Sequence, residues 1–165
     1  MRPFSFKHKF GRQILSLIQK YDHKKYWRRR NIVINPTNKT NILIKLYYLY
    51  YIKKTDAYHK CSFGTNLNSG SIFKTPPTLP HGPMGIIIGH DLEIGMNVTI
   101  FHQVTLAHGK SIIGDNVLFG AGSKLMSGFN VGSFSKIGAN AVVVEDIPEY
   151  STVVIQKPKI ILNEK

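Results

Sequence analysis

A hydrophobic position that returns every six residues is the feature that most restricts how this chain can fold. From residue 86 onward each step is six residues, except for one step of seven between Leu106 and Ile113. A period of six fits neither an amphipathic helix nor an alternating strand. It is typical of a β-solenoid in which three steps complete one coil and each repeated side chain points inward. The repeated positions are Ile88, Ile94, Ile100, Leu106, Ile113, Phe119, Leu125, Val131, Ile137 and Val143.

The single irregular step places one extra residue in the segment 107–111. Insertions in solenoids map to loops on one face, which is often the working face, although a harmless bulge is the plain alternative. Two histidines, His102 and His108, lie beside or within this segment. We therefore expect a functional loop at this corner.

The first third of the chain differs from the rest in charge. Residues 1–54 contain 14 Lys and Arg and one acidic residue, whereas residues 55–165 contain 8 of each sign. The spacing of apolar residues over 4–21 predicts a helix, and the segment 24–31 is expected to end it and begin a turn. A second helix is predicted over about 38–54. Residues 62–80 are rich in Gly, Pro, Ser and Thr and predict a loop that leads into the first coil. The expected division is a basic helical region, 1–61, and a β-helix domain, 62–165.

The basic region suggests several partners. Its charges can form a solvated face, or can contact an anionic membrane surface or an anionic lipid-linked or sugar-phosphate substrate. No recognised nucleic-acid motif is present, and we expect no nucleic-acid partner. The run 41–54 is interrupted by Lys45 and is too short to span a bilayer. We expect no signal peptide, and the single cysteine, Cys61, favours a cytoplasmic location.

Four segments together resemble a known family. HGPMGIIIG, IGMNVTIFHQVTL, IGDNVLFGAGSKLM and VGSFSKIGANAVVVEDIPEYSTVV resemble the serine acetyltransferase-like branch of the hexapeptide-repeat acyltransferases, over about residues 64–160. The resemblance implies a left-handed parallel β-helix, a homotrimer with active sites between subunits, and acetyl-CoA as the donor. No metal is expected.

The resemblance also implies catalytic residues. His81 occupies the place of the family's catalytic base, although three residues separate it from the next motif glycine where the amino-acid-modifying branch has two. The aspartate that orients this base corresponds to Asn66. An amide can hold the imidazole tautomer but cannot stabilise an imidazolium as a carboxylate does. The alternatives are that Asp56 or a carboxylate from another subunit takes this role.

Histidines near the insertion are the candidate substrate contacts. In serine acetyltransferases a longer loop carries an Arg and a His that hold the amino acid, whereas this chain has the short segment 107–111 and no arginine after residue 30. We expect His102 or His108 to approach His81 of a neighbouring subunit. His90 lies 18 residues before His108, one coil away, so these two should stack, with His90 as a plain surface residue.

The cofactor contacts implied by the resemblance are backbone amides along a groove, near Ala107, Gly122, Ser123 and Ala139. The usual Gly-x-Pro-Ala ending, at the tail of CoA, becomes Gln156-Lys157-Pro158-Lys159 here, in which Pro158 keeps the proline. The same small residues also suit the corners of a coil, which explains them without any ligand.

Several functions remain open at this point. An acetyl-CoA-dependent O-acetyltransferase acting on a sugar hydroxyl in polysaccharide biosynthesis is placed first, because of the short loop and the His81 spacing. Serine O-acetylation in cysteine biosynthesis is the alternative, and a catalytically degenerate scaffold is a third. A zinc site of three histidines across a subunit interface, as in related β-helix carbonic anhydrases, is less favoured because the close histidines are six apart rather than five. Cys61 as a nucleophile is also less favoured, because it lies outside the matched motifs.

Overall fold

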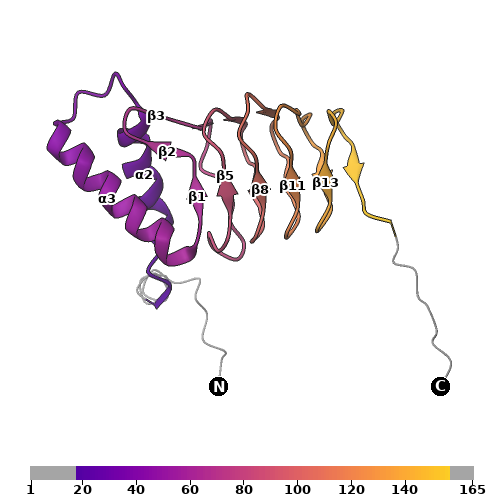
Figure 1. Cartoon of the computed structure of the whole chain (residues 1–165), viewed down its shortest axis with the longest axis horizontal. Helices are drawn as coiled ribbons and strands as arrows, with labels where there is room; N and C mark the ends of the chain where they lie inside the picture. Colours follow the sequence, from indigo (N-terminus) through magenta and orange to yellow (C-terminus); the bar gives the residue numbers. More distant parts are fainter. Residues whose placement is uncertain (1–17, 157–165) are drawn as a thin grey trace, which may run out of the picture.

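The molecule is a stack of β-coils with two helices packed at one end. A computed structural model describes residues 18–156, and Figure 1 shows the helices at the start of a row of parallel strands. Helix α2 spans His23–Ile34 and helix α3 spans Ile42–His59. The strands are β1 (Ser62–Phe63), β2 (Thr65–Asn66), β3 (Ser69–Gly70), β4 (Ile72–Phe73), β5 (Ile87–Ile88), β6 (Glu93–Ile94), β7 (Thr99–Ile100), β8 (Thr105–Leu106), β9 (Ile112–Ile113), β10 (Leu118–Phe119), β11 (Lys124–Leu125), β12 (Lys136–Ile137), β13 (Val142–Val143) and β14 (Thr152–Val153).

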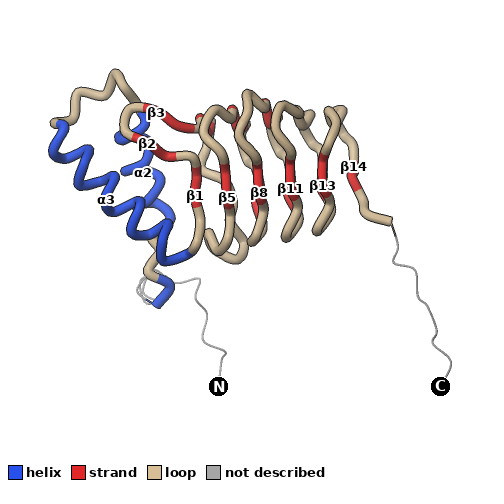
Figure 2. Tube along the Cα trace, in the orientation of Figure 1, coloured by secondary structure: helices blue, strands red, loops and turns tan. Residues whose placement is uncertain are grey.

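Three faces of parallel strands enclose the solenoid. Face 1 has the order β1-β5-β8-β11-β13, face 2 has β4-β6-β9, and face 3 has β14-β12-β10-β7. The chain visits face 1, then face 2, then face 3, and each strand pairs with the strand one coil later. Ile88 is thus opposite Leu106, and Phe119 is opposite Ile137. The predicted β-helix is confirmed, and the short strands are separated by the turns drawn in tan in Figure 2.

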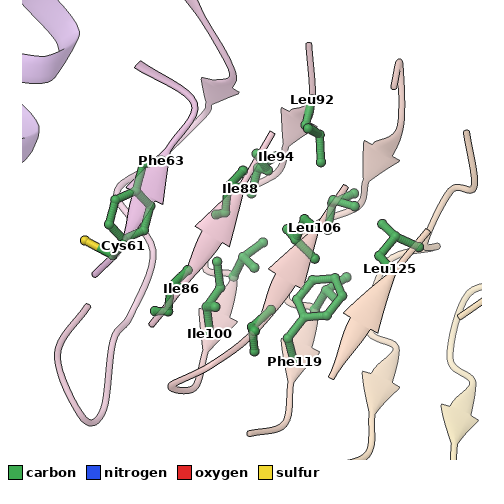
Figure 3. Packing of buried hydrophobic residues seen from close by; sticks show 14 of the residues in the cluster. Cys61, Phe63, Ile86, Ile88, Leu92, Ile94, Ile100, Leu106, Phe119 and Leu125 are labelled. Atoms are coloured by element: carbon green, nitrogen blue, oxygen red, sulfur yellow. The ribbon is translucent and has the colours of Figure 1, made fainter. Parts of the chain in front are cut away.

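The repeated side chains fill the interior of the coils. Each of the ten positions is at most 2% exposed, and the residues four further on, such as Val98, Val104 and Ser135, are also buried. Figure 3 shows Ile88, Leu106 and Leu125 following one another along this column. A period of six works because each strand contributes one inward side chain and each turn leads the chain onto the next of the three faces. The extra residue of segment 107–111 lies in the turn between β8 and β9, as expected of a loop.

The helices differ from the sequence-based expectation. The first predicted helix, 4–21, lies almost wholly outside the described residues. The turn predicted at 24–31 is wrong, because these residues form most of α2, whose buried side chains are Tyr26, Trp27, Arg30 and Val33. These buried residues are three or four positions apart and therefore form one face of the helix. The apolar pattern of this face could not be recognised in the sequence because Arg30, a charged residue, is one of its members. Asp22 caps the helix by accepting a hydrogen bond from the Lys25 amide at 2.9 Å.

Helix α3 begins and ends later than predicted. Asn41 caps it by accepting from the Leu43 amide, and Lys60 ends it in a left-handed conformation with φ 51°. The loop predicted over 62–80 is also wrong, because strands β1 to β4 form a first coil there. This coil lacks the six-residue period because β2 and β3 form an antiparallel hairpin between its first two faces.

The helical region and the first coil share one core. Trp27 packs edge-on against Phe63 and Phe73, at ring-centroid distances of 5.2 and 4.7 Å. The buried Arg30 guanidinium donates from Nη2 to the carbonyl oxygens of Phe63 and Ser71, both at 2.7 Å. The change at residue 62 is therefore a change of secondary structure across a continuous hydrophobic core.

Candidate active site

Three corners connect the faces, and each is named here by one residue. The His108 corner joins face 1 to face 2 and includes His90 and His108. The Asp115 corner joins face 2 to face 3 and includes Met96, Asp115 and Ser133. The His102 corner joins face 3 to face 1 and includes His102, Ala121 and Ala139. Successive coils stack equivalent residues at each corner.

The loop that carries His81 is held at both ends by backbone hydrogen bonds. Gly82 donates to Leu79 O at 3.1 Å, and Gly85 donates to His59 O, at the end of α3, at 3.0 Å. The amide of Gln103, in the His102 corner, donates to Met84 O at 3.0 Å. Gly82 has φ +72°, a conformation that glycine adopts without strain. Helix α3 and the next coil thus fix the position of this loop.

His81 lies beside His102 of the same chain. The two Nδ1 atoms are 2.9 Å apart, the ring centroids are 5.0 Å apart, and the rings are tilted by 35°. The Phe101 ring meets His81 edge-on at 5.4 Å. Within residues 18–156, Nε2 of His81 has no hydrogen-bond partner. His102 thus approaches His81 within its own chain, because the turn at residues 101–103 stacks directly on the His81 loop. The expectation that His102 or His108 approaches His81 of a neighbouring subunit stays a prediction.

A cavity of about 450 Å³ opens at His81. Its lining comes from the end of α3 and the His81 loop, and includes Tyr58, His59, Lys60, Pro83 and Met84. Nε2 of His59 is buried with no partner among the described residues. Burial lowers the pKa of His59 below its ordinary value, so this imidazole is neutral at pH 7. His59 was not among the residues expected from the sequence, because nothing in its helix distinguishes it.

Asn66 does not reach His81 within one chain. Its Nδ2 lies 3.3 Å from Nδ1 of His90, in the His108 corner. Asn66 lies fifteen residues before His81, where the family resemblance places the residue that orients the base. The hairpin β2–β3 instead places Asn66 at a different corner. Asp56 is also occupied elsewhere, since it is buried in α3 and accepts a hydrogen bond from the Tyr26 hydroxyl at 2.7 Å. Neither residue orients His81 in the single chain.

The predicted stacking of His90 and His108 is confirmed. Their ring centroids are 5.0 Å apart, and the amide of His90 donates to Nδ1 of His108 at 3.3 Å. Because Nδ1 of His108 accepts this bond, its neutral ring carries the proton on Nε2. His108 can therefore donate a hydrogen bond outward, from a corner that is distinct from that of His81.

Three of the four amides expected to bind CoA are already used by the coil. Ala107 donates to Leu125 O, Gly122 to His102 O, and Ser123 to Gly120 O, at 2.9 to 3.1 Å. The Ser123 side chain is also fully buried, so this residue cannot face a ligand. Ala139 differs, since its amide donates to no described residue. Pro158 lies outside the described residues.

The free amide of Ala139 belongs to a column. The equivalent residues one and two coils earlier are Ala121 and His102, and their amides also donate to no residue within 18–156. The i to i+3 bonds Ser123 N to Gly120 O and Ala141 N to Gly138 O, together with positive φ at Gly122 and Asn140, identify type II turns. Ala121 was missed, although it precedes Ala139 by one 18-residue coil and that period could have revealed it.

The Asp115 corner also turns through residues with positive φ, Asn97 and Asn116, but has no free amides at the preceding residues over its first two coils. The amide of Met96 donates to Oδ1 of Asp115 at 2.8 Å, and the amide of Asp115 donates to Oγ of Ser133 at 3.1 Å. Each polar side chain thus satisfies the amide one coil earlier. At the His102 corner the equivalent residues are alanines, which have no acceptor to offer.

Cys61 finds little support as a nucleophile. Burial raises the pKa of the Cys61 thiol well above its ordinary value, which disfavours the nucleophilic thiolate. Across residues 18–156, no three His, Cys, Asp or Glu side chains gather in a metal-binding arrangement.

The chain is similar to proteins of one family. Residues 111–145 match the family model described as the hexapeptide repeat of succinyl-transferase. A serine acetyltransferase of Helicobacter pylori (strain ATCC 700392 / 26695) is 40% identical over 109 residues, which cover 62% of this chain and 63% of that protein. The repeat domain is similar to the serine acetyltransferase-like hexapeptide-repeat acyltransferases.

Solved structures of this branch share the fold. A serine acetyltransferase in complex with CoA is 26% identical, with a TM-score of 0.60, over 78% of this chain and 50% of that chain. A serine acetyltransferase of Neisseria gonorrhoeae in complex with serine is 28% identical, with a TM-score of 0.54, over 68% of this chain and 48% of that chain. This hexapeptide-repeat chain spans about half the length of both. None of its helices within residues 18–156 is long and apolar enough to cross a bilayer.

Proposed function

We propose that this protein is an acetyl-CoA-dependent O-acetyltransferase whose acceptor is L-serine. The observation that carries the proposal is His81, which lines a cavity and lies beside a column of amides. Within residues 18–156, neither its Nε2 nor these amides have a hydrogen-bond partner. The serine acetyltransferase relatives support the acceptor. The sugar hydroxyl that sequence reasoning placed first has no such support among them.

The proposed reaction needs one base and one thioester. Nε2 of neutral His81 takes the proton of the acceptor hydroxyl while that oxygen attacks the thioester carbonyl carbon. The carbon–sulfur bond breaks, and the departing thiolate receives the proton from His81. The products are the O-acetyl ester and free CoA, and no acyl-enzyme forms.

The amide column of the His102 corner would hold the donor. The pantetheine arm of acetyl-CoA contains amide carbonyls that accept hydrogen bonds. The N–H groups of Ala121 and Ala139, which lie one coil apart, have no partner within the described residues 18–156 and could donate to them. Their methyl side chains leave the backbone accessible. A Cβ on Gly122 would collide with Oδ1 of Asn140, so this turn has room only for a glycine. The residues present therefore fit an extended ligand along this corner.

The rest of the site would come from a neighbouring subunit. His108 and Asn66 belong to a corner that does not meet His81 within one chain. In a homotrimer of solenoids, the His108 corner of one chain can face the His102 corner of the next. Nε2–H of His108 would then donate to the acceptor. An active site shared in this way requires the trimer.

The basic helices suggest a second contact. Lys53 and Lys54 are exposed on α3, on the same side as Leu46 and Tyr50. Such a mixed apolar and basic surface suits the headgroup region of an anionic bilayer. Flotation with phosphatidylcholine vesicles that contain or lack phosphatidylserine tests this contact. Equal binding to both, or none, would contradict it.

A sugar hydroxyl is retained as the second candidate acceptor. The short segment 107–111 and the absence of arginine after residue 30 favour it, since no guanidinium is available there for a carboxylate.

Thiol release from acetyl-CoA distinguishes these candidates. The purified full chain is assayed with L-serine and, separately, with nucleotide sugars and oligosaccharides. Thiol release with L-serine is expected. Release only with a carbohydrate would instead assign a sugar hydroxyl as the acceptor. His81→Ala should lower turnover by at least about 100-fold while CoA affinity stays near that of the wild type. CoA binding by calorimetry and mass by light scattering complete the test, because a trimer that binds no CoA would indicate a scaffold.

A further inference from the structure

We propose that His102 is the positioning residue of His81, in place of the carboxylate that orients the base in the resembling family. This inference rests on the proposed function, since it concerns the same base. It names a partner that acts through His81 and does not itself contact the reacting atoms.

The separation of the two rings requires a shared proton. Two Nδ1 atoms 2.9 Å apart are at hydrogen-bond distance, so one ring must donate and the other must accept. If His81 carries its proton on Nδ1 and donates to His102, Nε2 of His81 has a free lone pair and can act as a base. In the opposite assignment Nε2 of His81 carries a proton and cannot. We assign the donor role to His81.

The same hydrogen bond serves the charged state. When Nε2 of His81 takes the proton of the acceptor, Nδ1–H still points at the neutral His102 ring. A hydrogen bond from a cation to a neutral acceptor is stronger than the bond between two neutral rings. It is weaker than an ion pair with a carboxylate, so the stabilisation of the imidazolium is modest.

The backbone around the pair fixes its geometry. Gln103, the residue after His102, donates to Met84 O in the His81 loop, and His102 O accepts from Gly122 of the following coil. A Cβ on Gly85 would lie 3.2 Å from Cγ of Gln103, so this loop and the turn pack closely. His102 therefore lies on a turn that is held from both sides, which is what an orienting residue needs.

No other described residue competes for this role. Asn66 is engaged with His90, and Asp56 is buried beside Tyr26. The earlier expectation that His102 binds the acceptor predicts a different result, because loss of a substrate contact raises KM while loss of orientation lowers kcat.

Two substitutions separate the possibilities. His102→Phe keeps a planar ring and removes the acceptor, whereas His102→Gln keeps an acceptor oxygen. His102→Phe should lower kcat roughly 10- to 100-fold with little change in KM for either substrate, and His102→Gln should recover most of the loss. Tyr150→Leu is the matched control, since Tyr150 also stacks on an aromatic ring of the preceding coil, that of Phe134, but lies at the Asp115 corner, and it should leave kcat unchanged.

A spectroscopic measurement makes the test independent of activity. Imidazole ¹⁵N spectra of the full chain, with His81 assigned from its Asn variant, report which ring nitrogen carries the proton. We expect Nδ1–H for His81 in the wild type and loss of this preference in His102→Phe. An Nε2–H tautomer in the wild type, an unchanged kcat in His102→Phe, or a rise confined to KM would overturn the inference. If no acceptor is acetylated, the proposed function fails, and the spectra still decide the pairing.

Discussion

The His102 and Asp115 corners have similar backbones and different chemistry. Both turn the chain through a residue with positive φ, which is Gln103, Gly122 or Asn140 at one corner and Asn97, Asn116 or Phe134 at the other. At the Asp115 corner the residue before it carries a polar side chain in two successive coils, and that side chain accepts the amide of the preceding coil. At the His102 corner the corresponding residues are Ala121 and Ala139.

The difference shows how a repeat can contain a binding surface without changing its fold. Coil geometry needs only a small or flexible residue in each turn, so a carboxylate, a hydroxyl or a methyl group is equally compatible with it. What changes is whether the amides of the turn are satisfied internally or left for a ligand. Variants at matched positions can therefore test whether these two corners really have separate roles.

The largest expected effect is the pH dependence of the free energy of unfolding, which comes from Asp56, a residue outside both corners. The variants of the two corners should therefore be compared at one fixed pH. Burial raises the pKa of Asp56 to about 6, above the value near 3.9 of an unfolded chain. Between about pH 4 and 6 the folded protein thus holds a proton that the unfolded chain has released, so the free energy of unfolding falls as pH rises, by up to about 3 kcal/mol. Urea unfolding of the wild type and Asp56→Asn over this range should show the slope only in the wild type. Parallel curves would contradict it.

Proline at Ala139 should remove a ligand contact and leave the fold intact. The residue is the second of a type II turn, where proline is favoured, and its amide has no partner among the described residues. Losing the amide should weaken CoA binding by about 1 to 2 kcal/mol, roughly 5- to 30-fold, while the melting temperature is unchanged or slightly higher. Calorimetry of CoA binding and a thermal melt measure both. Unchanged affinity would show that this amide does not hold the donor.

Proline at Met96 is the reciprocal variant at the Asp115 corner. It occupies the same position of its turn, but its amide donates to Asp115 Oδ1. Met96→Pro should therefore cost about 1 kcal/mol of folding stability and leave CoA affinity unchanged. If instead Met96→Pro weakens CoA binding as much as Ala139→Pro does, the two corners are not functionally distinct.

The smallest effect is expected from Asp115→Ala. This change removes the acceptor for the Met96 amide and an ion pair with Lys74 at 3.6 Å. Both interactions are near the surface, where water can replace them, so a loss of about 0.5 to 1 kcal/mol is expected in chemical denaturation. Asp115→Asn keeps an acceptor oxygen and should recover most of it. A loss as large in the Asn variant would point to the charge rather than the hydrogen bond.

The sequence predicted the coils well and the first third of the chain poorly. The ten-fold repeat determines which side chains point inward, and all ten are buried because each six-residue step places its repeated side chain inside the coil. The helix of residues 23–34 was missed because its buried face includes Arg30, whose partners are carbonyl groups more than 30 residues away. A contact of that kind leaves no local pattern.

The candidate site was predicted in part for a similar reason. His81 follows from the family motif, and the stacking of His90 on His108 follows from the 18-residue coil. The proximity of His81 and His102 depends on how the loop at 79–86 docks on the next turn, which spacing alone does not determine. The free amides could be recognised only once the hydrogen bonds of each corner were known.

The buried Arg30 has a consequence for how these molecules can associate. Strands at the end of a solenoid expose unpaired backbone groups, and such an edge can recruit a strand from another molecule and start a fibre. Arg30, whose pKa is lowered by burial to about 10, donates to the carbonyl oxygens of Phe63 and Ser71 in the first coil. Trp27, also on α2, covers the rings of Phe63 and Phe73 in the same coil. End-to-end growth through this coil is therefore blocked by a single helix, whose loss would turn a closed end into a template for polymerisation.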